Sequence, residues 1–200
     1  AQGNSAYAAN EKFTPVSAVS NVDQTVITAG AFVTASKHLD ITSGASPNSN
    51  EGNHLTFFID YQNIGASTAT NVEIIDKLGL TGGDFDTRGF AYVPGSARWN
   101  GVALTDIKGS DPVGIDYEFG VSQSNQLRAV IENIAPRTQG RLEFKVDVIS
   151  GLQSGSGMTT NRAQIRYEDE GQPRQFSTNL AVYKVESSIV TRPDLVLKKK

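Results

Sequence analysis

The stretch 54–61, which reads His-Leu-Thr-Phe-Phe-Ile-Asp-Tyr, decides the fold. Its odd-numbered residues are all apolar, and this alternation is the spacing of a β-strand with one buried and one solvated face. The same alternation recurs at 142–148 and 163–167, with Gly, Ser, Asn and Pro clusters in between. Short half-buried strands joined by turns predict an all-β antiparallel β-sandwich. The side chains expected inside are Leu55, Phe57, Ile59, Val72, Ile74, Leu142, Phe144, Val146 and Ile165.

Composition excludes several classes of protein. The 200 residues contain 18 Lys and Arg against 21 Asp and Glu, for a net charge of −3, so no basic field invites nucleic acid. The apolar runs are too short for a transmembrane segment. No Cys and only two His argue against zinc, iron–sulfur and thiol chemistry. We therefore expect a protein that is not an enzyme and needs no cofactor.

Turn signals divide the predicted strands. Asn100-Gly101 is the strongest hairpin signal, because both residues accept the positive φ of a type I′ turn. Pro94-Gly95 suits the centre of a type II turn. Asn63, Gly65 and Asn71 are expected at strand ends, where positive φ and side-chain hydrogen bonds close turns.

Two segments near the N-terminus are similar in sequence to two segments near the C-terminus. Segment 4–21 is similar to segment 161–179, because each opens with Asn-x-Ala and later places Ser or Thr before an Asn that begins another strand. Segment 32–37 has a counterpart at 195–200. Such internal similarity is typical of tandem repeats.

The repeat predicts three parts. Residues 30–186 form one complete unit. Residues 1–29 are the terminal strands of a preceding unit, or an exchanged segment, and 187–200 are a linker and the first strand of a following unit, or an exchanged strand. The Ser-, Gly- and Asn-rich stretch 43–53 is expected to be a mobile connection.

The complete unit resembles the DUF11 conserved repeat domain family. The resemblance rests on motifs in the family's order: Asn63-x-Gly65, Ala69-x-Asn71-Val72 and Asp76-x-Leu78; Pro94-Gly95-Ser96, Asn100-Gly101 and Leu104-Thr-Asp106; Asp116-Tyr117-x-Phe119; Ile134-x-Pro136 with Phe144; and Asn161-x-Ala163. Arg137 departs from the family, which usually has Gly there. The resemblance implies an immunoglobulin-like sandwich, repeated in tandem in bacterial or archaeal surface and secreted proteins, with mostly structural roles and no general catalytic activity.

Catalytic arrangements have little support. His38 and His54 could each meet one of the serines between them, Ser43, Ser46 or Ser49, but no nucleophile-elbow motif is present. Glu168-Asp169-Glu170 looks like a charged hairpin tip rather than a glycosidase pair, since adjacent strand residues point to opposite faces.

Calcium is the metal that the sequence best suits. Asp84, Asp86, Asp106 and Asp111 lie in or beside predicted loops and could bring oxygen ligands together, as could the Glu168–Glu170 tip. None has the dense acidic spacing of a dedicated calcium loop, and solvated surface carboxylates are the simpler interpretation.

The sequence offers two further candidate sites. Lys37, Asn161 and either Glu73 or Asp76 are the residue types of an intramolecular Lys–Asn isopeptide bond, but the simpler interpretation is that Lys37 reaches solvent from an exposed face and Asn161 serves only its turn. Trp99, Tyr92 and Phe90 could form an aromatic platform for a glycan, with hairpin core packing as the favoured alternative.

The sequence thus predicts a structural repeat of a secreted or cell-surface protein, such as an S-layer, stalk or filament unit. Its partners would be neighbouring repeats or copies of itself. The alternative is an adhesin-type module that binds a glycan or surface protein through loops within 82–113.

Overall fold

The computed structural model describes residues 30–40, 54–79, 90–148 and 158–184. Every regular element in these ranges is a β-strand, and all the sheet pairings are antiparallel. The all-β, antiparallel sandwich expected from the sequence is confirmed. Predictions for 1–29, 43–53 and 187–200 concern residues outside the described ranges.

The first sheet contains six strands. Its order is β1-β2-β9-β5-β6, with β4 also paired to β9. The strands are β1 (Val33–Asp40), β2 (His54–Asn63), β4 (Phe90–Tyr92), β5 (Arg98–Trp99), β6 (Val102–Ala103) and β9 (Gln139–Val148). The stretch quoted at the outset is therefore most of β2, which lies between β1 and β9.

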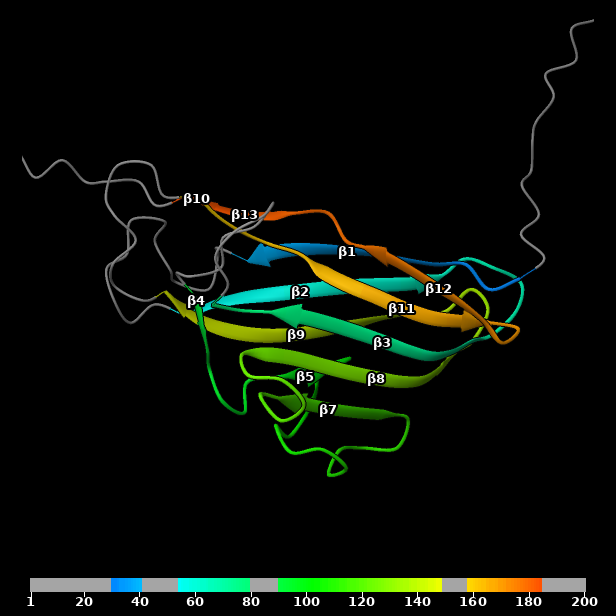
Figure 1. The fold of residues 1–200 in the computed structure, drawn as a ribbon, viewed down its shortest axis with the longest axis horizontal. Coiled ribbons are helices and arrows are strands. Elements are labelled where there is room, and N and C mark those ends of the chain that lie inside the picture. The colour runs from blue at the N-terminus through cyan, green and yellow to red at the C-terminus, as the bar shows by residue number, and fades with distance from the viewer. Residues whose placement is uncertain (1–29, 41–53, 80–89, 149–157, 185–200) are drawn as a thin grey trace, which may run out of the picture.

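The second sheet packs against the first and has the order β12-β11-β3-β8-β7. Its strands are β3 (Ala69–Lys77), β7 (Ile115–Phe119), β8 (Gln126–Ile134), β11 (Ala163–Asp169) and β12 (Gln172–Ser177). A short pair, β10 (Met158–Asn161) with β13 (Ala181–Lys184), lies beside β1 (Figure 1).

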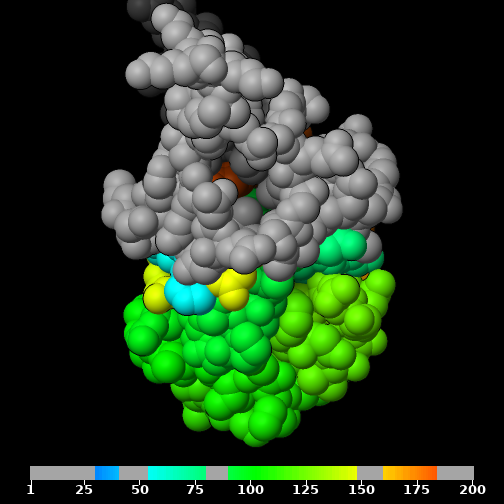
Figure 2. Space-filling view, turned by 90° about the vertical axis from the view of Figure 1, so that its left-hand side faces the viewer, coloured from blue at the N-terminus to red at the C-terminus, as the bar shows by residue number. Residues whose placement is uncertain are grey.

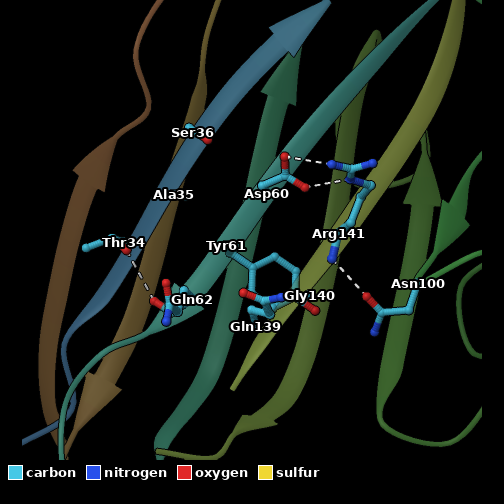
Figure 3. A pocket seen from close by; sticks show the side chains of 10 residues that line it. All are labelled: Thr34, Ala35, Ser36, Asp60, Tyr61, Gln62, Asn100, Gln139, Gly140 and Arg141. Atoms are coloured by element: carbon cyan, nitrogen blue, oxygen red, sulfur yellow. Dashed lines mark hydrogen bonds and ion pairs between the residues drawn. The ribbon is translucent and has the colours of Figure 1, made fainter. Parts of the chain in front are cut away.

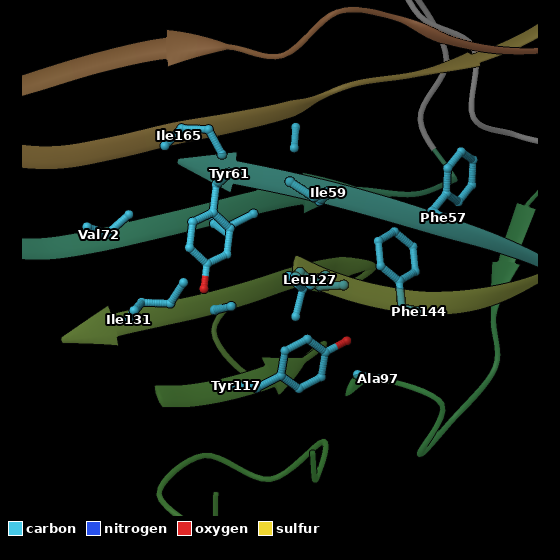
Figure 4. Close-up of a cluster of buried hydrophobic side chains, with 14 of the residues drawn as sticks. Phe57, Ile59, Tyr61, Val72, Ala97, Tyr117, Leu127, Ile131, Phe144 and Ile165 are labelled. Carbon is cyan, nitrogen blue, oxygen red and sulfur yellow. The ribbon is translucent and has the colours of Figure 1, made fainter. Parts of the chain in front are cut away.

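The core fills the space between the two sheets (Figure 4). All nine side chains expected inside are at most 1% exposed. Phe57 and Phe144, opposite each other on β2 and β9, have ring centroids 5.5 Å apart. Alternation along the strands thus placed the apolar face correctly, because each strand presents one side to the opposite sheet.

The predicted turns form with the expected backbone. Asn100 and Gly101 have φ of 50° and 83° and join β5 to β6, and Gly95 after Pro94 has φ of 70°. Arg137, where the resemblance to the DUF11 family leads one to expect Gly, takes φ of 60° in the turn before β9. A left-handed residue therefore occupies this turn although it is not Gly.

Two of the three predicted strand-end residues behave differently from expectation. Asn71 has φ of 49° but lies inside β3, at the point where the register with β11 shifts and Asn71 and Val72 together stand opposite Tyr167, which is a β-bulge. Gly65 is needed for close approach, since a Cβ there would lie 2.2 Å from the carbonyl oxygen of Gly30. Asn63 at the end of β2 donates to the Ile134 carbonyl and accepts from the Gly65 N–H, as a turn-closing Asn should.

The described chain runs from one end of the sandwich to the other. It enters β1 beside the β11–β12 hairpin, where the Ala31 N–H donates to Asp169, and it leaves β13 at the opposite end of the long axis (Figure 1). Figure 2 looks at the end near β4, where the green to yellow residues from β4 to β9 form one rounded surface.

Candidate functional site

Lys37 projects from β1 into the space between the sheets. It pairs across β1 and β2 with Ile59, a core residue, and is itself only 1% exposed. Its Nζ atom lies 4.4 Å from the ring centroid of Phe57 and 5.4 Å from that of Phe144. Among the residues whose exposure the structure describes, no other Lys or Arg is buried. The expectation that Lys37 reaches solvent is therefore wrong, because Lys37 has the strand parity of the buried Val33.

Asp76 meets this amine from the opposite sheet. It is the last inward-facing residue of β3, following the buried Val72 and Ile74 at intervals of two, and it is 0% exposed. Its Oδ2 atom accepts a hydrogen bond from Lys37 Nζ, forming an ion pair that joins the two sheets. Its second carboxylate oxygen, Oδ1, has no hydrogen-bond partner within the described structure.

Asn161 completes the group from β10. It is 1% exposed, and its side-chain amide lies near enough to Asp76 to favour the charged carboxylate. The two side chains are adjacent but not aligned, because Asn161 Nδ2 and Asp76 Oδ1 both lack a hydrogen bond of normal geometry in the described ranges. An amide nitrogen left unpaired in the interior is costly, so its presence calls for a physical reason.

Burial favours the neutral forms of the charged pair. It lowers the pKa of Lys37, although the attraction and hydrogen bond of Asp76 oppose this shift. Burial likewise raises the pKa of Asp76 against the opposing effects of Lys37 and Asn161. Both directions favour moving a proton from the ammonium to the carboxylate, which would leave a neutral amine beside a neutral acid.

Asn179 fixes the backbone of β1 at this point. Its side-chain oxygen accepts a 2.8 Å hydrogen bond from the Lys37 N–H, and its amide nitrogen donates to the Lys37 carbonyl at 2.8 Å. This Asn therefore replaces a neighbouring strand and holds the lysine in register. The sequence showed Asn179 only as part of the internal repeat, without indicating its contact with Lys37.

Glu73, the other acidic residue considered beside Lys37, lies on the outer face of β3. Its carboxylate accepts hydrogen bonds from Arg128 at 2.5 Å and from Arg166 at 3.3 Å. The structure thus brings Lys37, Asp76 and Asn161 together and leaves Glu73 on the far side of the sheet.

The calcium candidates that the structure describes serve loop geometry. Asp106 accepts hydrogen bonds from the Tyr92 hydroxyl at 2.6 Å and the Gly95 N–H at 2.8 Å. Asp111 accepts from the N–H groups of Thr105 and Tyr117, both at 2.7 Å. Within the described ranges no group of three acidic or His side chains is arranged to hold a metal ion. Asp84 and Asp86 lie outside those ranges.

The remaining candidates are separate from one another. His38 stacks on Phe58, 3.5 Å from an Asp60 oxygen, and the His54 ring nitrogen lies 2.5 Å from Asp147. The serines considered with these histidines lie outside the described residues. Of the predicted hairpin tip Glu168-Asp169-Glu170, only Glu170 lies in the turn, where it and Gly171 have φ of 51° and 76°; Glu168 and Asp169 belong to β11 and pair with β12.

The predicted aromatic platform does not face solvent as a group. Phe90 and Tyr92 are 3% and 9% exposed, as expected for core packing, and Trp99 donates to the Tyr61 hydroxyl at 2.5 Å. A polar hollow of about 660 Å³ lies instead on the outer face of the first sheet (Figure 3). Its lining includes Thr34, Gln62 and Gln139, together with the Asp60–Arg141 ion pair.

Comparison with known proteins adds a likeness of fold. No family model matches the sequence, and none of the curated proteins matches it. In three dimensions the chain is similar to the D312A variant of BcpA, the major pilin subunit of Bacillus cereus, with a TM-score of 0.55 and 11% identity over 78% of this chain. It is similar to the major pilin SpaD of Corynebacterium diphtheriae, with a TM-score of 0.52 and 13% identity over 75% of this chain.

A third similar structure is the 35 kDa C-terminal fragment of the major pilin GBS80 of Streptococcus agalactiae. Its TM-score is 0.51, with 12% identity over 78% of this chain. The match covers 41% of the BcpA chain, 35% of SpaD and 56% of the GBS80 fragment. The immunoglobulin-like sandwich that the sequence predicted is thus the fold that this chain shares with pilin domains.

Proposed function

We propose that this chain is a structural module of a secreted or cell-surface protein or filament, joined to its neighbours end to end. The observation that carries the proposal is the path of the described chain, which enters at one end of the long axis and leaves at the other (Figure 1). Modules with this path can be strung in line, so that force passes along each sandwich. Similarity in fold to major pilins supports the same role.

The sequence of the two flanking segments supports assembly through the ends of the module. Segments 1–29 and 187–200 resemble the closing and opening strands of the unit 30–186, so either a neighbouring repeat or an exchanged strand would complete each sheet. Head-to-tail completion is open-ended and builds a filament. The resemblance to the DUF11 repeat family supports a structural, non-enzymatic role on the cell surface. Among the described residues no helix has the length and hydropathy needed to cross a bilayer.

Self-association of the chain and its truncations tests the proposal. Sedimentation velocity would compare the full chain with 1–186, 30–200 and 30–186, while circular dichroism monitors the sandwich. We expect the full chain to associate as concentration rises, and removal of both flanks to abolish association without loss of strand signal. A full chain that stays monomeric, with the unfolding midpoint of 30–186, would contradict end-to-end assembly.

The adhesin alternative has less support from the geometry. A glycan platform needs converging exposed aromatic rings, and Phe90 and Tyr92 are buried. Within the predicted binding segment 82–113, the aliphatic side chains of Val102, Ile107 and Val113 are nevertheless exposed. Saturable binding on a panel of glycans and matrix proteins, lost when Ile107 and Val113 are replaced by Ser, would favour the adhesin over the spacer.

A further inference from the structure

The buried group of Lys37, Asp76 and Asn161 has a composition that packing alone does not explain. A buried ion pair contributes little net stability, because desolvation of both charges offsets their attraction. The adjacent Asn161 amide nitrogen has no hydrogen-bond partner in the described structure, and neither does one oxygen of Asp76. A buried amine that lies over two aromatic rings, together with a buried acid and a buried amide, supplies the reactants and the proton carrier for amide exchange.

We propose that Lys37 and Asn161 join covalently, with the Lys37 Nζ atom bonded to the Asn161 side-chain carbonyl carbon. This isopeptide bond would link β1 of the first sheet to β10. The proposal rests on the geometry of the three side chains and not on how the module is assembled with its neighbours.

The reaction balances without any external reagent. Asp76 takes a proton from the Lys37 ammonium, and the neutral amine attacks the Asn161 Cγ atom. Protonated Asp76 then hydrogen-bonds to the developing oxyanion, gives its proton to the leaving nitrogen, and takes up the second proton that Nζ loses as it becomes an amide nitrogen, so Asp76 ends protonated. The Nζ–Cγ bond forms, the Cγ–Nδ2 bond breaks, and ammonia departs.

The surroundings suit each step. Water exclusion by Phe57 and Phe144 favours the neutral amine, which is the nucleophilic form of lysine. The Asn179 clamp on the Lys37 backbone limits the positions that the amine can sample, so Asn179 is a positioning residue.

The choice of Asn161 over Asp76 as the acyl donor to Lys37 follows from hydrogen bonding. Loss of ammonia from Asn161 removes the unpaired buried nitrogen, and the new amide can bond to the free oxygen of Asp76. Bonding Lys37 to Asp76 would instead release water, consume the proton carrier and leave the Asn161 nitrogen unpaired. The two products therefore differ in mass as well as in mapped position.

Intact-mass measurement of the folded full chain tests the proposal. Bond formation lowers the mass by about 17 Da, the mass of ammonia. Trypsin should then yield residues 13–77, uncut at Lys37, joined to residues 146–162. Mapping is needed because ring closure at Asn100-Gly101 also releases ammonia, but it joins no two peptides.

Matched variants separate chemistry from folding. Asn161→Ala and the isosteric Asp76→Asn should fold, by circular dichroism, and keep their full sequence mass. The exposed controls Asn133→Ala and Lys145→Ala should remain cross-linked. Asn179→Ala should slow cross-linking of freshly refolded chain severalfold, without moving the linked positions. A folded wild-type chain at full mass would overturn the proposal, as would a link mapped to Asp76 or one formed equally well by Asp76→Asn.

Discussion

Two carboxylates three residues apart on β3 have opposite surroundings. Asp76 faces the core, is fully buried, and meets one lysine and one asparagine. Glu73 faces outward, where Arg128 and Arg166 share it in partial contact with water. Because side chains alternate across a strand, the spacing of three alone puts the two carboxylates on opposite faces. The difference shows that the position of a residue along the alternating strand, and not its type, decides which of the two carboxylates is buried beside Lys37.

Replacing each carboxylate by Ala should give the largest contrast. Asp76→Ala leaves Lys37 buried and unpaired, which costs about 3–5 kcal/mol, and it also prevents the proposed bond, so the total loss of unfolding free energy should exceed about 5 kcal/mol. Glu73→Ala should cost at most about 1 kcal/mol. Urea unfolding of both variants measures the contrast, and equal losses would break the comparison.

Asn161→Ala isolates the covalent contribution at the buried site. The bond closes a loop of about 125 residues between Lys37 and Asn161, and closing loops of this size stabilises by about 4–5 kcal/mol through the unfolded state. For a chain of this length the Tm should fall by roughly 10–20 °C. Scanning calorimetry with Asn133→Ala as the control tests this, and a Tm within about 2 °C of the control would argue against the bond.

Two aromatic rings, one near the buried Lys37 and one over the exposed Arg141, extend the comparison with smaller expected losses of stability. Phe144 contributes to the core around Lys37, and Phe144→Ala should cost about 3–5 kcal/mol through lost burial and a cavity. Phe58 lies over the exposed Arg141, 4.6 Å from ring centroid to guanidinium, and Phe58→Ala should cost nearer 1 kcal/mol. Denaturant midpoints measured side by side test the order, and the reverse order would show that Lys37 is not enclosed as described.

The smallest expected effect is the salt dependence of the unfolding free energy, which should differ between variants of Glu73 and variants of Asp76. The difference in unfolding free energy between wild type and Glu73→Gln, at most about 1 kcal/mol, should nearly vanish in 1 M NaCl, where the screening length is about 3 Å. The loss caused by Asp76→Ala should persist in the same buffer, because solvent ions do not enter the core. A Glu73→Gln difference that resists salt would mean that this cluster is effectively buried.

The sequence contained more of the site than residue types alone suggest. Lys37 shares parity with Val33, and Asp76 shares parity with Val72 and Ile74, so strand parity distinguishes Asp76 from Glu73 and indicates a buried lysine, although the prediction left both acids open and favoured a lysine that reaches solvent. Asn161 was less accessible to such reasoning, because β10 is short and its partner β13 follows twenty residues later. The Asn179 clamp joins residues 142 positions apart, and no local pattern reports such a contact.

By itself, the sequence determined the strands, their buried faces and several turns, since these depend on alternation and on residues that tolerate positive φ. Only the tertiary structure decided that β1, β3 and β10 bring an amine, an acid and an amide to one point between the sheets. The physical reason is that the register of distant strands is fixed by packing of the whole core, while parity fixes only the face. A buried charge is tolerated there because three strands, far apart in the chain, supply its partners together.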